Sequence, residues 1–66
     1  MSQPLIGITS FQQLNKYGHP MHAVMASYIQ AVACAGGLPV LIPLGLEEAA
    51  YQALFERLDG ILFTGG

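Results

Sequence analysis

Cysteine and histidine are too scarce in this 66-residue chain to hold a small fold together. Its single cysteine forms no intramolecular disulfide, and two histidines add no evident four-ligand metal site. A chain this short buries only about 60% of the surface it exposes when unfolded, so natural domains of this size usually add disulfides, a metal or a partner. We therefore expect a marginally stable piece of a larger domain, completed by a C-terminal remainder or by self-association.

Positive charge is nearly absent as well. Lys16 and Arg57 are the two fixed positive charges, and the formal net charge is −2. No basic patch can neutralise phosphates, which argues against nucleic acid binding. Charged residues make up 9% of the chain and hydrophobic residues 53%, the reverse of a disordered composition. The chain is therefore expected to pack a core.

A long unbroken apolar run is also lacking. The uncharged stretch AVACAGGLPVLIPLGL, residues 31–46, is slightly short for a membrane span, and Gly36, Gly37, Pro39 and Pro43 interrupt any helix through it. The start, MSQPLIGITS, has neither the positive charge nor the apolar stretch of a signal peptide. We expect no membrane partner and a cytoplasmic location.

Three short apolar runs alternate with two helical patterns, which indicates an α/β fold of parallel strands joined by crossover helices. The polar stretch SFQQLNKYGH, residues 10–19, is expected to be a loop. The expected elements are strands Leu5–Thr9, Pro39–Leu44 and Gly60–Thr64, a helix Pro20–Ala35 ended by Gly36, and a second helix between Gly45 and Asp59.

The order of the three strands follows from their continuous apolar character. Such strands need cover on both faces of the sheet. Because crossovers are right-handed, one helix falls on each face only if the first strand lies between the other two. Sequential order would leave an apolar face bare. The predicted strand order is therefore 2-1-3.

Ligands of open α/β sheets bind beyond the carboxyl ends of the strands, near the point where strand order reverses. Gly65 and Gly66 follow the third strand at this edge. Two residues without side chains let backbone N–H groups approach a reacting oxygen closely, although an ordinary turn is the alternative.

Three pieces of the sequence together resemble a known family: PLIGIT, Y-x-x-A-V-x-x-A-G-G-x-P-V-L-I-P from Tyr28 to Pro43, and LDGILFTGG from Leu58. They are similar to the start of the gamma-glutamyl-gamma-aminobutyrate hydrolases, a branch of the class I glutamine amidotransferase-like enzymes. The resemblance spans nearly the whole chain. It implies that residues 1–66 are the N-terminal part of a single flavodoxin-like three-layer domain, with the remainder absent.

The resemblance also implies a site. In that family a cysteine on a later nucleophile elbow, a histidine and a glutamate form a triad, and none of them maps onto this chain. The glycine-rich turn that helps form the oxyanion hole maps onto Gly65 and Gly66. The loop after the first strand lies near the substrate, so Ser10, Phe11 and Tyr17 are candidate contacts. The implied activity is hydrolysis of a small gamma-glutamyl amide without a cofactor, and the chain alone is expected to be inactive.

Other chemically capable side chains have more ordinary interpretations. Cys34 lies near a predicted helix C-terminus rather than on an elbow, so we expect a buried, slowly reacting thiol. His19 and His22 stand three apart at a predicted helix start without a third ligand, so no metal site is expected. Asp59 follows a helix and is expected to bond to the backbone.

Two other function classes stay open. Sugar-sensing domains of periplasmic-binding-protein-like repressors also begin I-G-I and contain a D-G-I-L strand, but AGGLPVLIP and the T-G-G ending favour the hydrolase. A flavodoxin-like nucleotide binder would need a phosphate loop such as G-x-G-x-x-G, which is missing. A downstream G-x-C-x-G would decide for the hydrolase, and further βα units without a cysteine elbow would favour the sensor.

Overall fold

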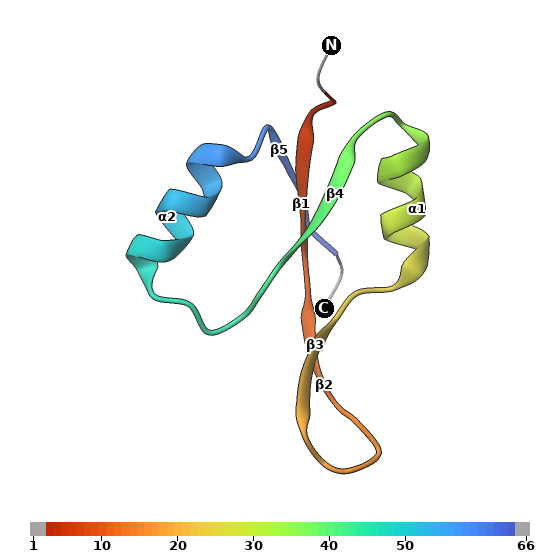
Figure 1. Cartoon of the computed structure of the whole chain (residues 1–66), viewed down its shortest axis with the longest axis vertical. Helices are drawn as coiled ribbons and strands as arrows, with labels where there is room; N and C mark the ends of the chain where they lie inside the picture. Colours follow the sequence, from red (N-terminus) through yellow and green to blue (C-terminus); the bar gives the residue numbers. More distant parts are fainter. Residues whose placement is uncertain (1–2, 65–66) are drawn as a thin grey trace.

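A computed structural model describes residues 3–64, in which a parallel sheet carries one helix on each face (Figure 1). A separate antiparallel hairpin extends beyond one end of the sheet (Figure 1). The elements are β1 (Leu5–Thr9), β2 (Phe11–Leu14), β3 (Pro20–Ala23), α1 (Ala26–Cys34), β4 (Leu38–Ile42), α2 (Glu48–Arg57) and β5 (Gly60–Leu62).

The strand order of the parallel sheet is β4-β1-β5, so the first strand is central as predicted. β1 pairs with β4 from Leu5↔Leu38 to Thr9↔Ile42, and it pairs with β5 along a shorter register. Figure 1 shows α1 and α2 on opposite sides of this sheet. Ile8, in the middle strand, is fully buried. The argument from apolar faces is therefore confirmed for these three strands.

The segment between β1 and α1 contradicts the prediction of a loop followed by a helix start at Pro20. It forms a hairpin, with Phe11 opposite Ala23 and Leu14 opposite Pro20. The side-chain oxygen of Asn15 accepts the N–H groups of Tyr17 and His19, each at 2.9 Å, and closes the turn. Proline, which lacks an N–H, is tolerated at the end of such a two-stranded pair, so Pro20 begins a strand here rather than a helix.

Helix α1 consequently begins at Ala26, later than predicted, and its end agrees with the prediction. Ala35 is the C-cap, and Gly36 follows with φ of +94°, a left-handed conformation that glycine adopts without steric cost. The strands β4 and β5 end at Ile42 and Leu62, slightly before the predicted limits. Within residues 3–64, no helix is long and apolar enough to cross a membrane.

Candidate functional site

The carboxyl ends of β1 and β4 border a pocket of about 600 Å³ that continues under α2. Its lining is largely apolar, with a few hydroxyl groups. Residues that line it include Thr9, Ser10, Pro43, Leu46, Tyr51 and Phe55. Because β1 lies where strand order reverses, this is the edge at which α/β sheets bind ligands.

Ser10 is the predicted substrate contact that reaches this pocket. Its side chain is 8% exposed, and its Oγ donates a hydrogen bond to the carbonyl oxygen of Ile42 at 2.6 Å. This bond extends the link between β1 and β4 past the last register pair. Since the hydroxyl hydrogen is already used, Ser10 can offer a ligand only an accepting lone pair.

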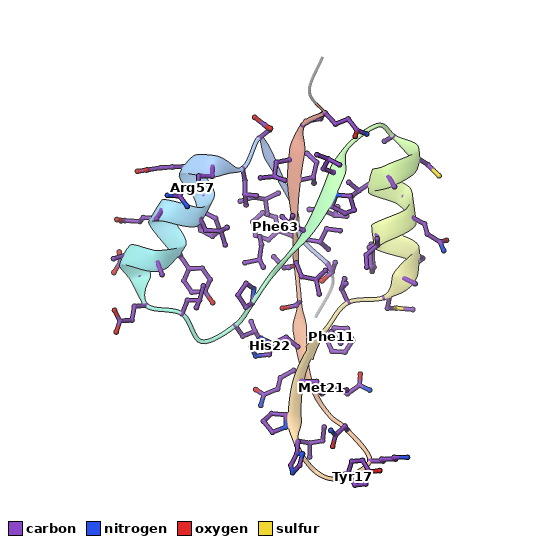
Figure 2. All side chains as sticks on the ribbon, in the orientation of Figure 1. Phe11, Tyr17, Met21, His22, Arg57 and Phe63 are labelled. Carbon is purple, nitrogen blue, oxygen red and sulfur yellow. The ribbon has the colours of Figure 1, made fainter. Side chains whose placement is uncertain are left out.

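The other two predicted contacts lie on the hairpin. Phe11 begins β2, next to Ser10, and is 39% exposed. Tyr17 is 71% exposed and lies at the far tip of the hairpin, beside Lys16, whose Nζ is 5.1 Å from the ring centroid (Figure 2). The structure therefore places Ser10 and Phe11 together and Tyr17 away from them.

Tyr51 fixes the loop that leaves β4. Its hydroxyl donates to the carbonyl oxygen of Pro43 at 2.7 Å and accepts the N–H of Leu46 at 3.3 Å. Its ring stacks on Phe55, with centroids 5.8 Å apart. Sequence reasoning missed this residue. The available signal was a tyrosine in the first half of a predicted helix, close in sequence to a proline-containing strand end.

The carboxyl ends of β1 and β5 are joined by two threonines. The backbone N–H of Thr64 donates to Oγ1 of Thr9 at 2.8 Å, and Oγ1 of Thr64 donates to the carbonyl oxygen of Thr9 at 3.0 Å. Both side chains are half-buried. Gly65 and Gly66, which follow directly, lie outside the described residues. Sequence reasoning missed the threonine pair, although the predicted strands Leu5–Thr9 and Gly60–Thr64 both end in threonine.

The sequence profile of the Peptidase C26 family matches residues 4–66. The chain belongs to this family. Gamma-glutamyl-gamma-aminobutyrate hydrolase PuuD of Escherichia coli strain K12 is 35% identical over 66 residues, 98% of this chain and 26% of that relative. Gamma-glutamyl hydrolase of Homo sapiens is 38% identical over 68 residues, 97% of this chain and 21% of that relative. The predicted resemblance is thus confirmed, and the chain spans about a quarter of the length of these relatives.

In this Peptidase C26 chain, Cys34 is exposed, so the prediction of a buried thiol was wrong. The buried residue of α1 is Val32. Cys34 is two residues further along the chain, which places it about 200° around the helix axis from Val32 and therefore away from the buried face. Its position at the end of α1 still differs from a nucleophile elbow, in which the thiol sits between a strand and a helix N-terminus.

We expect Cys34 to be alkylated by iodoacetamide in the folded protein as readily as an ordinary exposed thiol. Mass spectrometry of protein labelled without denaturant, compared with protein labelled in urea, checks this. A thiol that reacts only in urea would contradict the observed exposure.

The two histidines lie on the hairpin rather than at a helix start. His22 belongs to β3 opposite Gln12, and His19 belongs to the turn closed by Asn15. Among residues 3–64, no three histidine, cysteine, aspartate or glutamate side chains gather as a metal site would require. Asp59 bonds to the backbone as predicted, since its Oδ2 accepts the N–H of Leu5 at 2.7 Å.

Proposed function

We propose that this chain contributes the oxyanion-stabilising sheet edge of a cysteine-nucleophile hydrolase that cleaves gamma-glutamyl amides. Membership of Peptidase C26 and two relatives named as gamma-glutamyl hydrolases support the substrate class. The observation that carries the proposal is the junction of β1 and β5: their carboxyl ends are tied together immediately before Gly65, where the family's glycine-rich turn maps.

The proposed reaction divides the work between this edge and residues outside the chain. A thiolate attacks the amide carbonyl carbon, the C–N bond then breaks with proton transfer to the leaving amine, and water hydrolyses the resulting thioester to glutamate. Backbone N–H groups stabilise the oxyanion formed at each attack. Because Cys34 ends a helix and the relatives are about four times as long, we place the nucleophile and its base outside residues 1–66.

The wider architecture proposed here is the flavodoxin-like three-layer fold, of which β4, β1 and β5 provide the strand order 2-1-3. In this arrangement Ser10 and Phe11 border the substrate, with Ser10 offering an acceptor to it. Tyr17 would reach a substrate only if the hairpin folded over it. The chemistry needs no cofactor, and the proposed location is cytoplasmic.

The isolated 66-residue chain should release no glutamate from gamma-glutamyl amides. An oxyanion hole has nothing to stabilise until a nucleophile has attacked, and the one thiol is not placed for attack. A coupled glutamate assay on the purified chain, with Cys34→Ala alongside, measures this. Turnover that survives this substitution would reveal another mechanism, and turnover lost with it would make Cys34 the nucleophile.

A further inference from the structure

At each end of the β1–β5 strand pair, two hydrogen bonds join the strands, and at least one of the two involves a side chain. At the amino end, Asp59 Oδ2 accepts the N–H of Leu5 at 2.7 Å, and the N–H of Asp59 donates to the carbonyl oxygen of Leu5 at 2.8 Å. At the carboxyl end, Thr9 and Thr64 make the equivalent pair through a hydroxyl and a backbone group on each side. We call the second pair the threonine clasp.

The threonine clasp continues the contact between the two strands after their register ends at Ile8↔Leu62. Packing does little to hold this segment, because Phe63, between Leu62 and Thr64, is 77% exposed. Both the backbone nitrogen and the side chain of Thr64 are instead bonded to Thr9. The clasp thus holds Thr64, the residue directly before Gly65, against the central strand.

We propose that Thr9 and Thr64 are positioning residues for the oxyanion hole. The inference rests on the proposed hydrolase function and extends it to two residues that act through the backbone next to the proposed donors. A donor N–H stabilises the oxyanion only if it points at the place where the charge develops. The clasp acts one residue before the proposed donors, so it controls their orientation through the backbone.

Because the oxyanion exists only along the reaction path, loosening the clasp should lower kcat and leave KM nearly unchanged. Misplacing catalytic groups by about 1 Å costs roughly a hundredfold in rate, so we expect a loss of about tenfold to a hundredfold in kcat. Thr9→Val removes the acceptor of the Thr64 N–H, and Thr64→Val removes the donor to the Thr9 carbonyl, each with little change in shape.

The test uses the complete hydrolase with four clasp variants and one control. Thr9→Val and Thr64→Val should lose kcat, whereas Thr9→Ser and Thr64→Ser keep the hydroxyls and should recover most of it. Asp59→Ala is the control, because it opens the other end of the same strand pair. It should lower the melting temperature at least as much as Thr9→Val while kcat stays within about twofold of the parent.

A second readout separates the inference from the proposed function. In Thr9→Val, the amide hydrogen of Thr64 should exchange with solvent faster by NMR, because its acceptor is gone. If the parent releases no glutamate, the proposed function fails. If the parent is active but Thr9→Val keeps the parental kcat, or if Asp59→Ala loses kcat equally, the positioning role is overturned. Unchanged exchange at Thr64 would overturn the clasp itself.

Discussion

Replacing Gly65 or Gly66 by valine in the complete hydrolase should lower turnover roughly a hundredfold to a thousandfold, equivalent to about 3 to 4 kcal/mol of transition-state stabilisation. Both glycines directly follow Thr64, which is bonded to the central strand at the ligand-binding edge of the sheet. A side chain at either position can rotate the donating peptide or block the substrate. Steady-state kinetics on the two variants measures the loss.

The matched control is Gly36→Ala, at the opposite end of the sheet. Gly36 has φ of +94° with no atom near its would-be Cβ, so alanine there strains the backbone without a clash. It should lower the free energy of unfolding by about 1 kcal/mol and leave turnover unchanged. If both the Gly65 and the Gly66 variants hydrolysed substrate at the parental rate, the two glycines would have no role in the oxyanion hole.

Gly7→Ala should destabilise the sheet more than the same substitution at its other glycine, Gly60. Gly7 is in the middle of β1, and a Cβ there would lie 2.6 Å from Cδ1 of Leu58 and 2.7 Å from Cδ1 of Ile42. Ile42 is 5% exposed and has little freedom to move. Overpacking of this kind costs about 1–3 kcal/mol, measured as a decrease in the free energy of unfolding.

Two further variants decide whether crowding is the cause. Gly60→Ala, on the neighbouring strand, meets only Cδ1 of Ile6 at 3.1 Å and should cost clearly less. Ile42→Val removes one of the crowding methyl groups, so the Gly7→Ala/Ile42→Val pair should be less destabilised than the sum of the single changes. Strict additivity would point to a backbone effect of Gly7 rather than a clash.

The parallel sheet was predictable because its determinants are local and repeated. The apolar runs predicted the three strands, and the right-handed crossover rule predicted their order. Gly36 predicted the end of α1. The hairpin was not predictable, because its strands are four residues each and mostly exposed, and its turn depends on the Asn15 side chain. The burial predicted for Cys34 followed from its place near a helix end, whereas its exposure follows from its position about 200° around the helix axis from Val32.

The sequence predicted a ligand site at the edge of the sheet where the structure has a pocket, but the contacts within that pocket could not be predicted. Ser10 was singled out as a residue following the first strand, yet its bond to Ile42 depends on the register between β1 and β4. Thr9 and Thr64 are 55 residues apart, and only the folded sheet brings their hydroxyl groups within 3.1 Å.

The most direct test of the account is the rate of glutamate release by the complete protein from a gamma-glutamyl amide, measured beside the alpha-linked isomer of the same compound. Efficient hydrolysis of the gamma-linked compound, little hydrolysis of the alpha-linked one, and loss of activity in Gly65→Val are the predicted results. Binding of either compound without glutamate release would contradict the account and favour a small-molecule sensor.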